Sequence, residues 1–245
     1  LNVKQLALGA LHGCALDAEG VKCWGHNSSG QTNVPALSNP TKVYAGAFHT
    51  CAQDDAGLKC WGQSDSGQFG ITEMQNPELL VLGNRYSCGY NESGLKCFGD
   101  NSYAQLVGPT LRPFQKIDTS ESHACAIADG KMTCWGYGMA LTNIPSLSNV
   151  RKVTTASHLT CALDDSGAHC WGYDGDGQTN VPALENPKDI EAASQNVCAI
   201  DDTGIKCWGN NSYGQLSIPE LSNPTQVAVG YNHICALSDA GVTCW

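Results

Sequence analysis

The sequence lacks several features that would assign a function directly. It contains no apolar run near the roughly 18 residues that a membrane-spanning helix needs, so we expect no membrane insertion. It also lacks the G-x-S-x-G and H-E-x-x-H motifs and any phosphate-binding glycine loop, which mark common enzyme classes. We therefore predict no catalytic residue, no cofactor and no enzymatic activity.

Basic residues are scarce. Lys and Arg number 13 against 23 Asp and Glu, which gives a formal net charge of −10. A negatively charged surface repels phosphate backbones and anionic membranes. Nucleic acid is therefore not an expected partner.

Cysteine, in contrast, is abundant, and its fourteen copies form seven C-x8-C pairs. Zinc ligands usually lie two to four residues apart and need a second pair nearby, so no metal site is predicted. An even count at one fixed spacing is typical of disulfides in an oxidising compartment, which indicates a secreted, periplasmic or cell-surface protein. The expected bridges are Cys14–Cys23, Cys51–Cys60, Cys88–Cys97, Cys125–Cys134, Cys161–Cys170, Cys198–Cys207 and Cys235–Cys244.

The cysteine pairs mark an internal repeat. Successive first cysteines are 37, 37, 37, 36, 37 and 37 residues apart, so seven copies of one unit fill the chain. In repeat two, the stretches TKVYAG, HTCAQ and LKCWG predict three short strands, with the turn DDAG between the last two. In repeat one, a four-residue turn at residues 17–20 would place Cys14 opposite Cys23, close enough for a disulfide within the hairpin.

An aromatic residue follows the second cysteine of every repeat: Trp in six copies and Phe98 in repeat three. We interpret it as a wedge between neighbouring repeats. Three short strands cannot bury both faces alone, and seven all-β units that stack radially form a closed β-propeller. We therefore predict an all-β, seven-bladed β-propeller with one disulfide inside each blade, as a single domain over residues 1–245. The seven sets of strands and six connectors fit a closed ring, although a trimmed fragment is the alternative.

The full phrase V-x-x-G-x-x-H-x-C-A-L-x-x-x-G-x-x-C-W-G-x-N-x-x-G-Q resembles the repeat of the regulator of chromosome condensation family of seven-bladed propellers. Members of this family share a scaffold rather than one activity. The cysteine pairs and the lack of a basic tail distinguish the sequence from the nuclear members. The resemblance therefore implies the secreted bacterial branch.

Antiparallel strand order places the G-x-x-H turns and the W-G-x-N-x-x-G-Q loops on one face, with the acidic hairpin turns on the other. Side chains on the first face differ between repeats, as expected of a heterogeneous binding surface, although drift at exposed turns would look the same. Tyrosines there suit protein or sugar ligands. The candidate binding residues are Leu11, Phe48, Arg85, His158, Tyr231 and Asn232 at the turns and Tyr103, Tyr137, Met139, Tyr173 and Tyr213 in the loops.

Two other residue sets have ordinary explanations. The acidic hairpin turns would be spread around a ring, which favours turn chemistry over calcium binding, and Asp174-Gly175-Asp176-Gly177 lacks the remaining calcium ligands. The repeated histidine becomes Leu159 in repeat five, which favours hydrogen bonding within each blade over a metal or catalytic role. We expect an extracytoplasmic recognition module that binds a protein, like an adhesin or an enzyme inhibitor. The alternatives are a lectin-like propeller and a structural domain of a larger surface or fibre protein.

Overall fold

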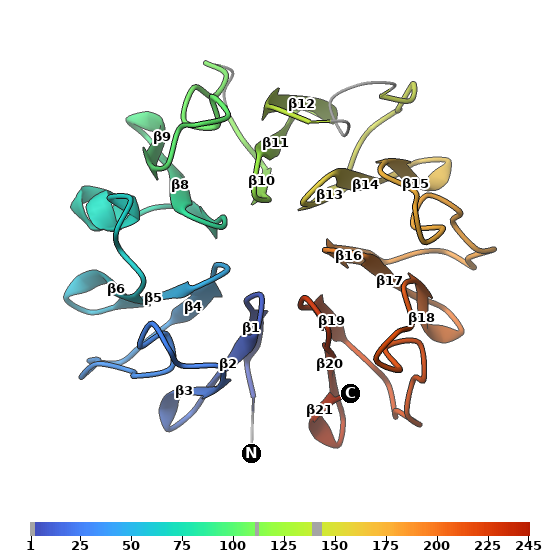
Figure 1. The fold of residues 1–245 in the computed structure, drawn as a ribbon, viewed down its shortest axis with the longest axis horizontal. Helices are drawn as coiled ribbons and strands as arrows, with labels where there is room; N and C mark the ends of the chain where they lie inside the picture. Colours follow the sequence, from blue (N-terminus) through green and yellow to red (C-terminus); the bar gives the residue numbers. More distant parts are fainter. Residues whose placement is uncertain (1–2, 111–112, 139–143) are drawn as a thin grey trace. The chain divides into compact units, whose positions relative to one another are not determined.

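The computed structural model describes residues 3–110, 113–138 and 144–245. These residues form 21 strands in seven three-stranded antiparallel sheets, together with one 3-10 helix, η1 (Gln68–Glu73) (Figure 1). None of the helical structure described is long and apolar enough to cross a bilayer. The chain divides into two compact units, Leu1–Thr110 and Leu111–Trp245.

The first unit contains three sheets, one from each of the first three repeats, coloured blue to green in Figure 1. In each sheet the three strands follow one another in chain order. The strands are β1 (Gln5–Leu8), β2 (His12–Asp17), β3 (Gly20–Gly25), β4 (Lys42–Ala45), β5 (His49–Asp54), β6 (Gly57–Gly62), β7 (Leu79–Leu82), β8 (Tyr86–Asn91) and β9 (Gly94–Gly99).

The second unit contains four sheets with the same strand order, one from each of repeats four to seven. The strands are β10 (Lys116–Thr119), β11 (His123–Ala128), β12 (Lys131–Gly136), β13 (Lys152–Ala156), β14 (Leu159–Asp164), β15 (Gly167–Gly172), β16 (Asp189–Ala193), β17 (Asn196–Asp201), β18 (Gly204–Gly209), β19 (Gln226–Val229), β20 (Ile234–Ser238) and β21 (Gly241–Cys244).

The hairpin register agrees with the prediction. Cys14 lies opposite Cys23, and the pairing continues to Asp17 and Gly20. Only two residues are therefore unpaired at the turn, fewer than the four-residue loop that the sequence indicated.

All seven predicted disulfides are present, and every cysteine is paired. In the first bridge the Cα atoms of Cys14 and Cys23 are 4.1 Å apart, a distance typical of directly opposed residues in an antiparallel pair. The first cysteine of each pair is fully buried. Each bridge therefore joins the second and third strands of its own sheet.

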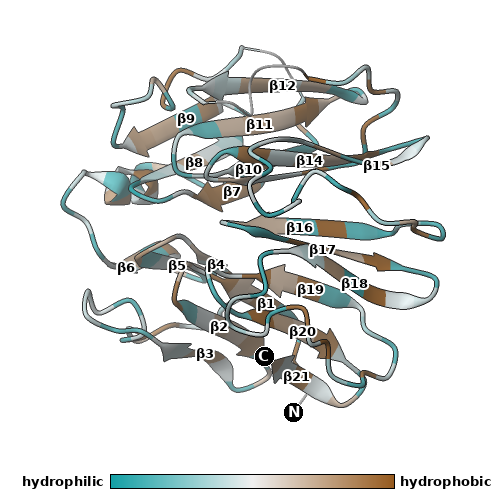
Figure 2. Ribbon diagram, turned by 45° about the vertical axis from the view of Figure 1, so that its right-hand side comes forward, coloured by the Kyte–Doolittle hydropathy of each residue, from teal (hydrophilic) through white to brown (hydrophobic). Residues whose placement is uncertain are grey.

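Hydrophobic side chains hold neighbouring sheets together within each unit. Hydrophobic residues concentrate on the strands, and the loops are mostly hydrophilic (Figure 2). In the second unit, Ile190 of β16 is fully buried in a cluster with Leu163 of β14 and Trp208 of β18. Burying such aliphatic side chains stabilises the fold by about 1.5–3 kcal/mol each. Packing between repeats therefore supplies the core that one repeat lacks.

Repeated tryptophans pack between sheets, as predicted, and three of them, Trp61, Trp208 and Trp245, also donate a hydrogen bond to the preceding repeat. The indole N–H of Trp61 donates to the backbone oxygen of Gln31 in the preceding repeat, at 2.9 Å. Trp208 and Gln178 repeat this contact at 2.8 Å. At these junctions the backbone oxygen of the G-Q glutamine therefore accepts the indole of the next repeat.

Candidate binding surface

The G-x-x-H turns have a closed backbone. In repeat two the N–H of Gly46 donates to the oxygen of His49 at 2.8 Å, which leaves Ala47 and Phe48 at the tip. A Cβ atom on Gly46 would lie 2.6 Å from the imidazole of His49, so glycine is needed beneath the ring. The turn therefore presents two side chains from a fixed backbone.

Each of the first six tips is joined to the loop that follows the third strand of the same repeat. The N–H of Gln63 donates to the oxygen of Phe48 at 2.9 Å, and that of Tyr173 donates to His158 at 2.8 Å. Equivalent bonds occur in repeats one, three, four and six. The predicted placement of tips and loops on one face is confirmed within each of these six repeats. We call this surface, the G-x-x-H tips with the loops after W-G, the tip–loop face.

Three repeated histidines, His12, His49 and His123, bond to the next sheet, whereas hydrogen bonds inside each blade were expected. His123 also makes the expected bond within its own repeat, to the hydroxyl of Ser120 at 2.8 Å. The Nε2 atom of His49 lies 3.0 Å from the hydroxyl of Ser87, and that of His123 lies 2.9 Å from the hydroxyl of Thr160. Burial lowers the pKa of His49 to about 3 and, with a contribution from His158, that of His123 to about 4. Both rings are therefore neutral at physiological pH and act in packing.

The loops are held by their own polar residues. The buried side chain of Gln178 accepts the N–H of Asp176 at 2.8 Å, and Asp174 accepts the N–H of Thr179 at 2.8 Å. Asp176 also accepts the side chain of Asn210 at 3.1 Å. Asp174 therefore closes the loop backbone, and Asp176 links the loop to the next repeat. No group of three or more His, Cys, Asp or Glu residues suited to a metal occurs in the described chain.

Most candidate binding residues are exposed on the tip–loop face. Tyr213 and Tyr137 are the most accessible tyrosines, at 72% and 67%, while Phe48 is half-buried. Met139 lies outside the described residues. The other candidates are exposed: Leu11, Arg85, Tyr103, His158, Tyr173, Tyr231 and Asn232.

Three candidates come together in the second unit. Tyr173 is bonded through its backbone to His158, as described above. A Cβ atom on Gly138 would lie 3.6 Å from the ring of His158, so this ring lies beside the residue that follows Tyr137. Ser122 reinforces the junction by donating its hydroxyl to the oxygen of Ser157 at 3.1 Å. We call Tyr137, His158 and Tyr173 the Tyr137 patch.

In the first unit, Arg85 has a structural contact as well as exposure. Its guanidinium lies 2.9 Å from Asp65 and donates to Ser66 at 3.0 Å. The tip of repeat three is thereby attached to the loop of repeat two.

Two exposed hydrophobic residues were missed by sequence reasoning, Val107 at 69% and Ile144 at 45%. Both lie in connectors, where no repeated pattern marked them.

The acidic hairpin turns on the opposite face are used for backbone hydrogen bonding. Asp54 accepts the N–H groups of Ala56 and Ser38 at 2.8 and 2.9 Å, and its carboxylate lies 2.8 Å from the Lys59 ammonium. The Lys59 hydrogen bond and these backbone donors lower the pKa of Asp54 to about 2. Asp55 accepts the side chain of Asn39 at 2.6 Å. The turn chemistry expected from the sequence is confirmed, and it also anchors the connector.

The comparison with known repeats agrees with this geometry. Residues 3–31 match the family model "Regulator of chromosome condensation (RCC1) repeat". The chain is built of RCC1-type repeats. No curated protein matches the sequence. The placement of this RCC1-type propeller in a secreted bacterial branch stays a prediction.

Solved structures of similar fold include plant and yeast proteins. The CRINKLY WD40 ectodomain of the Arabidopsis thaliana receptor kinase ACR4 is 20% identical, with 99% of this chain and 95% of that chain covered and a TM-score of 0.79. The ectodomain of the Physcomitrella patens receptor kinase CR4 is 18% identical, with coverage of 99% and 73% and a TM-score of 0.78. Yeast RCC1 (Prp20), crystallised with Kap60, is 16% identical, with coverage of 94% and 78% and a TM-score of 0.77.

At these identities the likeness defines the fold alone. The fold class is the predicted one, an all-β, seven-bladed propeller of RCC1-type repeats with one disulfide inside each blade. The seven bridges of this propeller indicate an oxidising environment. Its candidate binding residues remain predictions, because the comparisons assign no role to them.

Proposed function

We propose that this RCC1-type propeller is an extracytoplasmic recognition module that binds a protein partner through its tip–loop face. The observation that carries the proposal is the combination of a fixed backbone with varied, exposed side chains. The tips are closed by backbone hydrogen bonds and tied to the loops, yet they present Leu11, Arg85 and His158 at equivalent positions. Little backbone entropy is then lost on binding.

The proposed location is the outside of the cell or the periplasm. Seven disulfides persist only where thiols are not kept reduced. Two proteins of similar fold are ectodomains of receptor kinases, which supports an extracellular setting for this architecture.

A protein is the favoured class of ligand. Exposed tyrosines have few rotatable bonds and combine apolar area with a hydroxyl group, which makes them effective anchors at protein interfaces. Yeast RCC1 was crystallised with the protein Kap60, so this fold can support protein binding. The net charge of −10 opposes binding to nucleic acid.

Within the tip–loop face we assign the leading role to the Tyr137 patch. Tyr137 and Tyr173 are 67% and 41% exposed. The exposed His158 has its ring beside Gly138 and its backbone oxygen bonded to Tyr173. Their backbones are held by bonds to Ser122 and His158. The patch therefore joins two aromatic anchors and a hydrogen-bonding group across neighbouring sheets.

The test is site-specific photocrosslinking in the native environment, with a benzophenone amino acid in place of Tyr137. We expect a discrete crosslinked protein that disappears when H158A and Y173A are added. The matched control carries the same probe at Glu220, an exposed connector residue outside the patch. Equal crosslinking from both positions, or none from position 137, would refute the assignment.

A glycan array with the same variants separates the lectin alternative. Protein binding predicts no glycan signal that depends on Tyr137 and Tyr173. A saturable glycan signal that is lost in Y137A and Y173A would replace the protein partner with a carbohydrate.

A further inference from the structure

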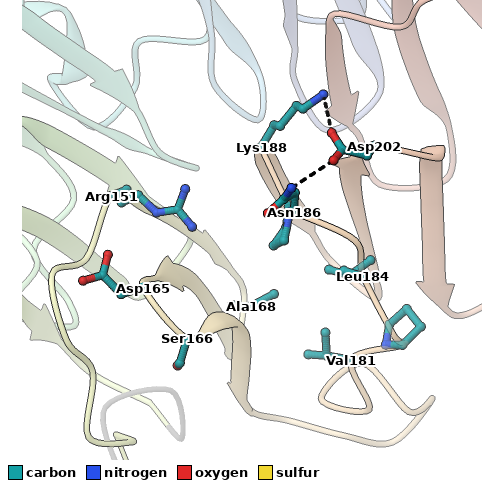
Figure 3. Close-up of a pocket in the computed structure, with 12 residues that line it drawn as sticks. Arg151, Asp165, Ser166, Ala168, Val181, Leu184, Asn186, Lys188 and Asp202 are labelled. Atoms are coloured by element: carbon teal, nitrogen blue, oxygen red, sulfur yellow. Dashed lines mark hydrogen bonds and ion pairs between the residues drawn. The ribbon is translucent and has the colours of Figure 1, made fainter.

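A groove in the second unit lies away from the tip–loop face. It runs between the hairpin turn of the fifth sheet, residues 165–168, and the connector and hairpin turn of the sixth (Figure 3). Its volume is about 690 Å³, within the range of ligand-binding clefts. Figure 3 shows Arg151 and Asp165 on one side and Asn186, Lys188 and Asp202 on the other. The rim residues are exposed, so the groove is open to a ligand.

Ala168 explains why the groove forms at this junction. In repeat two the equivalent residue, Leu58, belongs to one buried cluster with Ile71 and Met74 of the next connector. Alanine leaves this space open beside Val181 and Leu184. The other repeats have a larger side chain at this position: Val21, Leu58, Leu95, Met132, Ile205 and Val242.

Two cationic side chains border the groove. Their occurrence at one position in two consecutive repeats is a second departure from the repeat pattern. Arg151 and Lys188 occupy equivalent positions in repeats five and six, because their N–H groups bond the second strands at Leu163 and Ile200. No other two consecutive repeats both carry a cation at this position, where the remaining residues are Lys4, Thr41, Glu78, Gln115 and Thr225.

Arg151 is the cation available to a ligand. Lys188 is paired with Asp202 at 2.8 Å, and Asp202 also accepts Asn186 at 3.0 Å. Arg151 donates one N–H to the backbone oxygen of Asp164 at 2.8 Å, and none of the ion pairs in the described chain includes it. Its remaining guanidinium N–H groups can therefore donate to a carboxylate from outside.

We propose that this groove binds a peptide segment of a protein partner in which an aliphatic side chain precedes a carboxylate side chain. The aliphatic group would lie over Ala168, Val181 and Leu184, and the carboxylate would pair with Arg151. Arginine suits this role because its planar donors match both carboxylate oxygens. The site is separate from the tip–loop face, so either proposal can fail alone.

The probe is the peptide acetyl-Gly-Leu-Glu-Gly-amide, titrated into the oxidised, isotope-labelled chain and followed by amide chemical shifts. A short motif of this kind should bind with a Kd of about 1 mM. We expect saturable shifts at residues 165–168, 184–186 and 188. The Gln analogue of the peptide should bind about fivefold more weakly, because it loses the charge-assisted bond.

Two variants test the two halves of the groove. R151Q should remove the preference for Glu over Gln, and A168L should weaken both peptides about fivefold by filling the floor. Leucine occupies this position in repeats two and three, so the sheet accommodates it, and a thermal melt checks folding. I205L, the same position in repeat six, is the matched control and should bind normally.

Shifts absent from residues 165–168, a Glu preference that persists in R151Q, or normal binding by A168L would each overturn the proposal. Acetate included as a third probe separates a bare carboxylate site from a peptide site. Acetate binding as tight as that of the peptide would overturn the peptide assignment.

Discussion

At the residue scale, the repeated positions are explained by contacts between repeats. A glycine lies beneath the ring in the turns of His12, His49 and His233, and Ser120 takes this place beside His123, where its hydroxyl bonds the ring at 2.8 Å. The sequence displayed this pattern. It did not reveal that the histidines bond to the next sheet, because a period of 37 residues relates equivalent positions and says nothing about which side chains meet across the junction.

A charged cluster on the first strands of the second unit was also missed. Lys152 of β13 lies 2.8 Å from Asp189 and 2.5 Å from Glu191, both on β16. Asp118 of β10 accepts the hydroxyl of Thr155 at 3.0 Å. Loss of hydration, with the nearby Glu191 charge, raises the pKa of Asp118 to about 7. These residues lie in three different repeats, so no motif joins them.

The raised pKa of Asp118 predicts a pH-dependent contribution to stability. The native state holds this proton between about pH 4 and 7, whereas the unfolded chain releases it near the ordinary aspartate pKa of 3.8. The contribution of Asp118 to the free energy of unfolding therefore falls as the pH rises through that window, and it stays lower at higher pH. D118N should match the wild type at pH 4 and exceed it by on the order of 1–3 kcal/mol at pH 8.

Urea unfolding at both pH values measures this difference. The low pKa values of the buried histidines give the opposite pH trend in both proteins, so subtracting the wild-type value isolates Asp118. A gap that is constant with pH would contradict the assigned pKa.

At the element scale, the hairpin turns of repeats two, five and six are also anchors of connectors. The first Asp of the turn accepts N–H groups from its own turn and from the preceding connector in repeats two, five and six. The second Asp accepts the side chain of a connector asparagine, as in the Asn39–Asp55 pair. Sequence reasoning identified the turn because its chemistry is local. The connector contact spans 16 residues and leaves no local signal.

This arrangement predicts that the two aspartates of one turn differ in importance. D54A leaves the N–H groups of Ser38 and Ala56 without their acceptor and Lys59 without its partner, so the melting temperature should fall by roughly 4 °C or more. D55A loses the exposed contact with Asn39 and should melt close to the wild type. Calorimetry on both variants makes the comparison, and equal shifts would disprove the anchoring role.

At the scale of the whole molecule, the sequence predicted the fold more fully than the function. Cysteine, tryptophan and glycine recur at a regular spacing, so every repeat has a similar surface to bury against its neighbours. Few all-β architectures allow seven similar units to pack in this way. The binding residues are harder to predict, because tips such as Arg85 and His158 are exposed and are not determined by packing. The assignment of residues 1–245 to a single domain stays a prediction.

The last prediction concerns the disulfides. Each one restricts the unfolded chain of its own repeat and thereby stabilises the folded state. A bridge that closes a loop of about ten residues removes on the order of 2.5 kcal/mol of chain entropy in the simple model. Denatured protein without reductant should show no free thiol, and reduction should release all fourteen. Proteolytic mapping should find only bridges that join cysteines nine residues apart. The melting temperature of the reduced, alkylated chain should be well below that of the oxidised chain. Bridges between repeats, or an unchanged melting temperature, would show that the sheets are stabilised in another way.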